Sequence, residues 1–297
     1  MKIKDIIGII RAPFLILAPM CVLLGVATAY SQGIPLNYSH LFLVFLGGIL
    51  AHVSVNSLNE YFDFINGLDF KTIKTPFSGG SGVLVSKPQL ARYALIIGIS
   101  SAIIVSIIGL YFIYIRGLTM LLIGMLGLVM VLFYPVLFVK SSLLSLLSPG
   151  LGFGISMVLG THIALGGTIG NKEILVASVP FFLVNNLLLL NQFPDREPDE
   201  SVGRRNVVIV FGRKKSALIY SSFNILAYLT IIIGVIIGEL GYFALISLLT
   251  LGFALLSSVK AIKNYNNIKA LLPAQGMNVM VNILTPLLLS IGLIFRY

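Results

Sequence analysis

Apolar residues dominate the sequence in long runs that are separated by shorter polar segments. A helix needs roughly 20 apolar residues to cross the hydrocarbon core of a bilayer. The 297-residue chain holds nine charge-free windows of about this length. The pattern predicts an all-α polytopic membrane protein with nine transmembrane helices. These windows cover residues 13–30, 41–58, 93–115, 118–139, 143–168, 174–193, 217–237, 242–259 and 278–294.

Basic residues fall mainly on one side of the predicted spans. With the N-terminus in the cytoplasm, seventeen of the 20 Lys and Arg residues lie on the inner side, and only Arg116, Lys172 and Arg296 lie outside. This excess matches the positive-inside rule. It predicts a protein of the cell membrane with a cytoplasmic N-terminus and an extracytoplasmic C-terminus. The net charge of +10 then reflects topology and anionic lipid rather than nucleic acid.

Acidic residues gather in two inner connections, 59–92 and 194–216, which hold seven of the ten Asp and Glu residues. Both connections open with the pattern Asn-x-x-x-Asp, at Asn59 and at Asn191. An offset of 132 residues relates the two, which indicates a pseudo-repeat of helices 1–4 and 5–8 with helix 9 left over, in one domain over 1–297. Two acid-bearing helix ends on one membrane face are expected to converge on a central cavity open to the cytoplasm.

The spacing within each motif suits a metal ion that holds a diphosphate. Residues four apart lie on one face of a helix, so Asn59 and Asp63 form one row of oxygen ligands, and Asn191, Asp195 and Asp199 form another. Mg²⁺ takes one or two carboxylates and completes its shell with water and phosphate oxygens. We expect the two rows to hold Mg²⁺ on a diphosphate, although loop-end acids that only pair with nearby cations are the alternative.

Basic and glycine-rich segments lie next to both motifs. A diphosphate leaving group needs positive charge around it, and four cations are candidates for a clamp: Lys71, Lys74, Lys140 and Arg204. Ser78 and Gly79 begin a Ser-Gly-Gly-Ser-Gly stretch whose backbone amides can approach an anion closely. No Gly-Lys-Ser/Thr follows that stretch, so it is not a P-loop.

Other residue types narrow the chemistry further. The single Cys21 and the three scattered histidines argue against a Cys or His metal site and against a Ser-His hydrolase. We expect His52 to hydrogen-bond a neighbouring helix, with lining of the cavity as the alternative. Aromatic residues near the motifs, Tyr134 among them, could shield an allylic cation from water, although packing explains most of them.

Taken together, these residues resemble the UbiA superfamily of intramembrane prenyltransferases. The resemblance covers nearly the whole chain and is strongest to the menaquinone branch, which prenylates 1,4-dihydroxy-2-naphthoate. It rests on the paired Asp motifs, on the segment from Arg11 to Leu15 before the first span, and on the run from Val202 to Asn206 that includes Arg204 and Arg205. The resemblance implies that Arg11, Arg204 and Arg205 contact substrate.

The first motif departs from that family in two places. Glu60 stands where many members have Asp, and Gly67 stands where many have a third acid. Asp69 could replace that acid, but six residues along a continuous helix would turn it away from Asp63. Asp69 can therefore ligate metal only if Gly67 ends or kinks the helix.

The residues and the resemblance together predict a transferase of alkyl or aryl groups other than methyl. Its substrates would be a prenyl diphosphate and a small aromatic acceptor, its cofactor Mg²⁺, and its surroundings membrane lipid, with no obligate protein partner. Alternative acceptors are 4-hydroxybenzoate, a haem precursor and a glycerol-phosphate ether. A secondary transporter of an anionic metabolite is a rival from another class, and a purely structural membrane subunit would leave the paired motifs unexplained.

Overall fold

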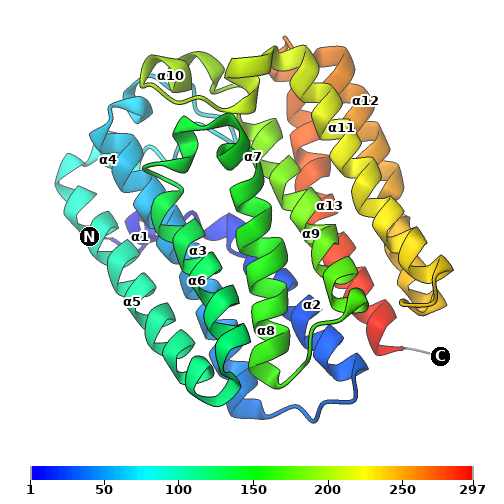
Figure 1. The fold of residues 1–297 in the computed structure, drawn as a ribbon. Helices are drawn as coiled ribbons and strands as arrows, with labels where there is room; N and C mark the ends of the chain where they lie inside the picture. The colour runs from blue at the N-terminus through cyan, green and yellow to red at the C-terminus, as the bar shows by residue number, and fades with distance from the viewer. Residues whose placement is uncertain (1, 296–297) are drawn as a thin grey trace.

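The computed structural model describes residues 2–295, and within that range every regular element is helical (Figure 1). Arg296, one of the basic residues expected outside the membrane, lies beyond the described residues. The elements are α1 Ile3–Ile9, η1 Ala12–Phe14, α2 Leu17–Ser31, α3 Tyr38–Ile65, η2 Leu68–Phe70, α4 Val83–Ser86, η3 Pro88–Leu90, α5 Ala91–Arg116, α6 Leu118–Phe133, η4 Phe138–Lys140, α7 Ser142–Gly150, η5 Leu151–Met157, α8 Val158–Leu165, α9 Asn171–Asn191, α10 Arg196–Ser201, α11 Val207–Ile236, η6 Tyr242–Thr250, α12 Leu251–Asn264 and α13 Ile268–Ile294.

Most of these helices have the length and composition of membrane spans. Among the described residues, eight stretches are long and apolar enough to cross a bilayer. They are Ala12–Ser31, Tyr38–Ile65, Pro88–Arg116, Ser142–Leu165, Asn171–Asn191, Val207–Ile236, Tyr242–Asn264 and Ile268–Ile294. The all-α membrane architecture is confirmed. The remaining predicted span, 118–139, corresponds to α6, which has only 16 residues, so the count of nine stays a prediction.

Four span boundaries lie six or more residues from those predicted. The second span ends at Ile65 instead of residue 58, and the seventh starts at Val207 instead of residue 217. The fourth was expected to reach residue 139, but α6 ends at Phe133. Pro135 follows shortly after, and its lack of a backbone N–H removes a donor that a continuing helix would use. The ninth was expected to start at residue 278, but α13 starts ten residues earlier, where the Asn267 side chain accepts a hydrogen bond from the Ala270 amide at 3.1 Å.

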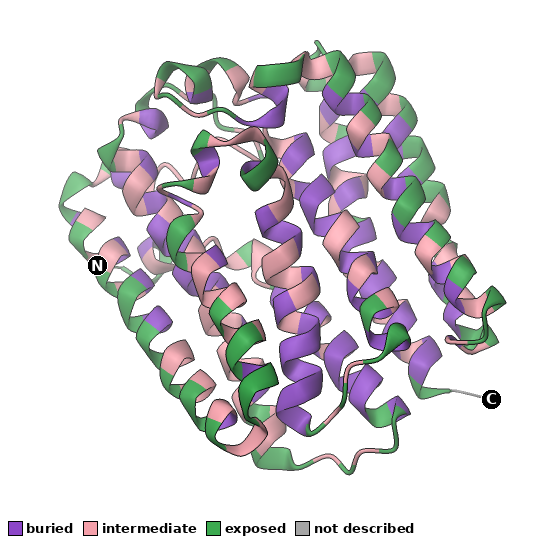
Figure 2. Ribbon diagram, in the orientation of Figure 1, coloured by how far each residue is buried: buried purple, intermediate pink, exposed green. Residues whose placement is uncertain are grey.

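Burial divides the bundle into a packed interior and an apolar outer surface (Figure 2). The interior helix α2 packs through small residues, and Ala18, Cys21 and Ala27 are fully buried. Small side chains let membrane helices approach closely. On the outside, α5 exposes large side chains such as Ile103 and Ile107. These apolar faces suit contact with lipid tails.

The fifth span is irregular. Pro149 lies inside α7, and the following turns form the π-helix η5 before α8 resumes regular geometry. Proline removes a backbone donor, and π-helical turns absorb the resulting misfit. These turns belong to the wall of the cavity described below.

The polar connections gather at one end of the bundle. Figure 1 shows α4 and α10 at the same end, while the turns after α2 and α8 lie at the opposite end. The two acidic motifs belong to the first of these ends. The predicted convergence of the motifs on one face is therefore visible in the fold.

Candidate active site

A cavity of about 530 Å³ lies between α3, α5, α6 and the run from α7 to α8. Along α3 its lining residues extend from Leu43 to Asp63, which at 1.5 Å per residue is a depth of about 30 Å. The deep part is lined by apolar side chains and glycines, and the polar residues gather at one end. Such a shape suits a long apolar molecule with a charged head group.

The first motif reaches the cavity from α3. Asn59 and Asp63 both line it, as their spacing on one helix face predicts. The helix ends at Ile65, and Gly67 takes a left-handed φ of 75°, which side chains with a Cβ adopt at a cost. The chain then turns into η2 and brings Asp69 back to the cavity wall. The helix therefore breaks between Asp63 and Asp69, as ligation of a metal ion by Asp69 requires.

The second motif has a different backbone from the one predicted. The expectation that Asn191, Asp195 and Asp199 share one face of a continuous helix is wrong, because α9 ends at Asn191 and α10 begins at Arg196. Asp195 sits in the N-cap position of α10. All three residues still line the cavity. The turn between α9 and α10, rather than helical periodicity, directs the three side chains into the cavity.

Arg204 joins the two motifs. Its guanidinium pairs with Asp63 on one side, and its Nη1 donates to Asp199 Oδ1 at 3.0 Å on the other. Asn206 donates to the second oxygen of Asp199 at 2.8 Å. The carboxylates outweigh the effect of burial, which alone would lower the pKa of Arg204, and they raise it above its ordinary value. Arg204 therefore stays charged, and in this structure it occupies the centre of the acidic cluster.

The carboxyl groups at this end are costly to ionise all at once. Burial, followed by repulsion from Glu60 and Asp63, raises the pKa of Asp69 to about 7. Burial and the Asp199 charge raise the pKa of Asp195 to about 7, against a lowering contribution from the Gly79 amide. Burial also raises the pKa of Asp199 to about 6. A site with these properties favours a bound cation.

The donor set fits Mg²⁺. Oδ2 of Asp69 and Oδ1 of Asp195 are buried oxygens without a hydrogen-bond partner among the described residues. Within the same residues, no group of three His, Cys, Asp or Glu side chains is close enough to enclose an ion alone. Mg²⁺ commonly takes one or two carboxylates and leaves the other positions to water and phosphate oxygens. The oxygens present are therefore hard ligands for an ion shared with a substrate.

The glycine-rich stretch forms a second wall of the polar end. Ser78 and Gly79 line the cavity with Gly80. Gly80 has φ 71°, and a Cβ there would lie 2.6 Å from Asp69 Oδ1, so the position requires glycine. The loop is closed by Thr75, whose Oγ1 accepts a hydrogen bond from the Ser78 amide at 2.9 Å. The backbone is thus held close to the first motif.

Arg11 and Glu60 connect this loop to the N-terminal segment. Glu60, which is fully buried, accepts from Arg11 Nε at 2.7 Å and from the Ser81 amide at 2.9 Å. Arg11 lines the cavity and has an uncommon left-handed φ of 50° for a residue with a side chain. Reasoning from sequence noted Glu60 only as a departure from the motif. The signal available in the sequence was an acidic residue directly after an apolar span.

The predicted cationic clamp is only partly assembled. Of its four members, only Arg204 lines the cavity. Lys71 donates to Ser201 Oγ at 3.1 Å, and Lys74 bonds the Ser81 carbonyl of its own loop. Lys140 ends η4 at an exposed position, and the backbone amide of the exposed Arg205 donates to the Val139 carbonyl at 3.0 Å. Tyr134, by contrast, does line the cavity.

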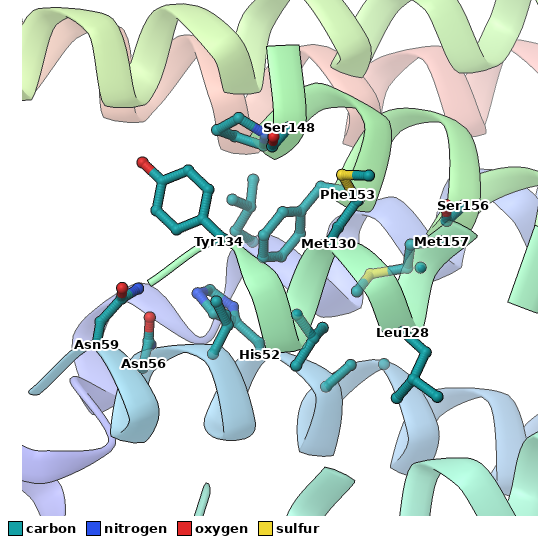
Figure 3. A pocket seen from close by; sticks show the side chains of 18 of the residues that line it. His52, Asn56, Asn59, Leu128, Met130, Tyr134, Ser148, Phe153, Ser156 and Met157 are labelled. Carbon is teal, nitrogen blue, oxygen red and sulfur yellow. The ribbon is translucent and has the colours of Figure 1, made fainter. Parts of the chain in front are cut away.

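His52 also differs from expectation. It makes no hydrogen bond with any described residue, so the expected bond to a neighbouring helix is wrong. The alternative holds, because its side chain lines the cavity next to Phe153 (Figure 3). The two ring centroids are 4.7 Å apart in an edge-to-face arrangement.

Comparison with known proteins supports this description. Residues 18–279 match the profile described as the UbiA prenyltransferase family. The chain is 26% identical over 264 residues to the 1,4-dihydroxy-2-naphthoate octaprenyltransferase of Bacillus subtilis (strain 168), which covers 86% of this chain and 82% of that protein.

Two solved structures share the fold. The apo structure of a UbiA homolog from Aeropyrum pernix K1 has a TM-score of 0.72 at 18% identity, covering 94% of this chain and 98% of the other. A UbiA homolog from Archaeoglobus fulgidus, bound to GPP and Mg²⁺, has a TM-score of 0.67 at 14% identity, covering 96% and 99%. The match to the family profile extends over most of the sequence. The chain therefore belongs to the UbiA prenyltransferase family.

Proposed function

We propose that this prenyltransferase moves a polyprenyl group from a prenyl diphosphate to an aromatic acceptor similar to 1,4-dihydroxy-2-naphthoate, as a step of quinone biosynthesis. The observation that carries the proposal is the placement of two carboxylate motifs, joined by Arg204, at the polar end of a deep apolar cavity. The name of the Bacillus subtilis relative and the Mg²⁺-bound Archaeoglobus fulgidus homolog support the acceptor and the cofactor.

The polar end would hold the diphosphate. Asp63, Asp69, Asp195 and Asp199 would hold Mg²⁺, with Asn59 as a further oxygen ligand. Bound Mg²⁺ would supply Lewis-acid stabilisation of the diphosphate as negative charge builds on it. Arg204 now pairs with two of these carboxylates, so it is poised to exchange them for phosphate oxygens when metal and substrate arrive.

The remaining lining residues would assist cleavage of the allylic C–O bond. Arg11 and the Gly79 amide are placed to donate to the leaving diphosphate, and the Ser78 amide holds the loop in position through its bond to Thr75. Tyr134 presents its ring to the cavity, where it would shield the allylic cation from water. An electron-rich ring carbon of the acceptor then attacks that cation, and the ring loses a proton.

A transfer assay tests the proposal. Purified protein would receive Mg²⁺, labelled farnesyl or geranylgeranyl diphosphate and a panel of acceptors: the naphthoate, 4-hydroxybenzoate, a haem precursor and glycerol phosphate. Diphosphate release coupled to a prenylated naphthoate is the expected result. Prenylation of another member would reassign the acceptor. Uptake of an anion into proteoliposomes without any product would instead indicate a transporter.

We further propose nine membrane spans, with α6 as the short one and the active site facing the cytoplasm. Reporter fusions check this arrangement. A reporter in the connection 194–216 should be cytoplasmic, and one attached to the C-terminus should be extracytoplasmic. Two reporters on the same side of the membrane would contradict the three spans between them. With a cytoplasmic N-terminus, an extracytoplasmic 194–216 reporter and a cytoplasmic C-terminal reporter would indicate that α6 does not cross.

A further inference from the structure

An unpartnered imidazole lies inside the cavity, away from the acidic motifs. His52 is 5% exposed, and neither of its ring nitrogens bonds a described residue. Its Nδ1 is enclosed by protein, so Nε2 is the ring nitrogen that a molecule in the cavity can reach. An ionisable side chain in a membrane span is costly, and buried polar atoms without partners are rare. A ligand that supplies the missing partner explains why the residue is there.

The position of His52 on α3 limits what that ligand can be. His52 precedes Asn59 by seven residues and Asp63 by eleven, so it lies about 10 Å and about 16 Å deeper along the helix. A diphosphate held at Asp63 is therefore about three turns away. The prenyl chain is a hydrocarbon with no hydrogen-bonding atom. Neither part of the donor can satisfy the imidazole, which leaves the second substrate.

Two residues, Asn56 and Phe153, lie next to His52 on the cavity wall. Asn56 lies one turn closer to the motif on the same face of α3 and lines the cavity. Its Nδ2 donates to the Ile10 carbonyl at 3.0 Å, and Figure 3 shows its oxygen pointing into the cavity. Phe153 places a ring against the imidazole. A hydrogen-bond acceptor, an imidazole and an aromatic ring thus meet on one wall.

We infer that His52, Asn56 and Phe153 form the subsite for the aromatic acceptor, an inference that rests on the proposed function. The acceptor ring lies between the levels of Asn59 and His52, packed against Phe153. One ring hydroxyl donates to an imidazole nitrogen, and a hydroxyl nearer the motif donates to Asn56 Oδ1. A fused ring in this space has one edge at the reacting end of the donor and the opposite hydroxyl at His52. The ligand class is therefore a hydroxylated aromatic ring, and a fused bicyclic ring suits the depth.

Substitution of His52 separates acceptor recognition from donor chemistry. His52→Leu keeps apolar bulk but removes both nitrogens, and we expect it to raise the KM for the acceptor about 10- to 100-fold, while the KM for the prenyl diphosphate changes less than about twofold. His52→Gln restores one polar group and should recover part of the loss. His40→Leu is the matched control, because His40 is on the same helix, bonds Tyr111 at 3.1 Å and does not line the cavity.

An acceptor that lacks one ring hydroxyl completes the test. The wild type should bind this analogue more weakly than the full acceptor, and His52→Leu should bind both equally, since the partner atom is gone. Unequal binding by His52→Leu, at the ratio seen in the wild type, would overturn the inference, as would an equal loss for donor and acceptor.

Direct titrations distinguish this failure from failure of the proposed function. If the wild type binds prenyl diphosphate but no hydroxylated aromatic compound, the subsite is refuted and the donor half of the proposed function stands. If it binds neither, both are refuted.

Discussion

The half of the bundle that contains α3, α5 and α6 surrounds the cavity, whereas no described residue of α11, α12 or α13 lines it (Figure 1). Both halves bury polar side chains in apolar surroundings. In the cavity half, Asp69, Asp195 and His52 carry polar atoms without protein partners. In the other half, most polar side chains bond to protein groups, and the buried oxygens that lack a partner among the described residues, such as those of Gln275 and Asn282, do not line the cavity.

The half that contains α11, α12 and α13, which we call the filled half, shows how hydrogen bonds between side chains hold a membrane bundle together. Asn186 Nδ2 donates to the Tyr220 carbonyl at 2.8 Å and to Asn224 Oδ1 at 2.9 Å. Asn224 in turn donates to Ser258 Oγ at 2.9 Å, which links α9, α11 and α12. Tyr220 fills the space with a fully buried ring. Bonds of this type hold helices together in lipid.

The contrast teaches that a buried polar residue is not by itself a sign of a site. Its unused hydrogen-bonding capacity, directed into a cavity, is the better sign. Polar residues of the cavity half should therefore affect activity more than folding. Those of the filled half should affect folding more than activity.

The largest expected effect comes from the carboxylates. Asp63→Asn, Asp195→Asn and Asp199→Asn each remove a charge that the metal and diphosphate need, so turnover should fall about 10²- to 10⁴-fold. Thermal unfolding should hardly change, because Asn is nearly isosteric. Turnover measured against Mg²⁺ concentration checks this.

Glu197→Gln is the matched control for those variants. The Glu197 side chain is 62% exposed and pairs with Arg213 at 2.7 Å, outside the cavity. Its loss should lower turnover by less than about tenfold, since only an exposed ion pair is removed. A loss as large as that of the Asp variants would show that the proposed set of ligands is wrong.

The next largest effect concerns the deep apolar part of the cavity. Gly124 lines the cavity, and a Cβ there would meet only Met120 Cε at 3.9 Å. Gly124→Leu should narrow the deep part of the cavity. It should lower kcat/KM for long prenyl diphosphates about 10- to 100-fold, with little change for dimethylallyl diphosphate. Leucine suits a helix better than glycine, so folding should not suffer.

Gly252→Leu in α12 provides the comparison for that variant. A Cβ at Gly252 would meet nothing within 4 Å, and the residue does not line the cavity. Its donor-length profile should match that of the wild type. If Gly124→Leu slows short and long donors equally, the donor chain does not pass this point.

A smaller effect follows from the raised carboxyl pKa values. The pKa values of Asp69 and Asp195 are about 7, and that of Asp199 is about 6, in the metal-free protein. Each group must lose its proton to ligate Mg²⁺. All three acids are mostly ionised at pH 8, whereas at pH 6 Asp69 and Asp195 are mostly protonated and Asp199 is about half protonated. Mg²⁺ affinity should therefore fall as pH falls, by about tenfold or more between pH 7.5 and 6.

Calorimetric Mg²⁺ titration at several pH values checks this dependence. Asp195→Asn should show a shallower slope, because it removes one of the titrating ligands. A constant affinity between pH 8 and 6 would contradict the assignment of these carboxylates as ligands.

Sequence reasoning recovered the features that depend on local spacing. The charge-free windows found the helices, and the Asn-x-x-x-Asp pattern placed Asn59 and Asp63 on one face of α3. The need for a break at Gly67 also followed from spacing. The second motif was predicted less well, because the regular Asn-x-x-x-Asp spacing favoured a continuous helix although Pro194 stands between α9 and α10.

The remaining features depend on contacts between distant segments. Glu60 meets Arg11 and Ser81, which are 49 and 21 residues away in the chain. Arg204 meets Asp63 across 141 residues. For Lys71 and Lys74, charge and proximity to the motif could not reveal that the loop turns them elsewhere. The missing partners of His52 likewise appear only once the helices are packed.

The smallest expected effect comes from the filled half. Asn224→Ala removes the bonds to Asn186 and Ser258, and we expect it to lower the free energy of unfolding by about 1–2 kcal/mol. Turnover per folded molecule should stay within about twofold of the wild type, because Asn224 does not line the cavity. Ser222→Ala is the control, since Ser222 is exposed on the same helix and bonds only the Leu218 carbonyl of its own turn, at 3.0 Å. Unfolding in detergent, followed together with turnover, separates the two effects. Lower turnover at unchanged stability would mean that the filled half contributes to the site, and the contrast between the two halves would fail.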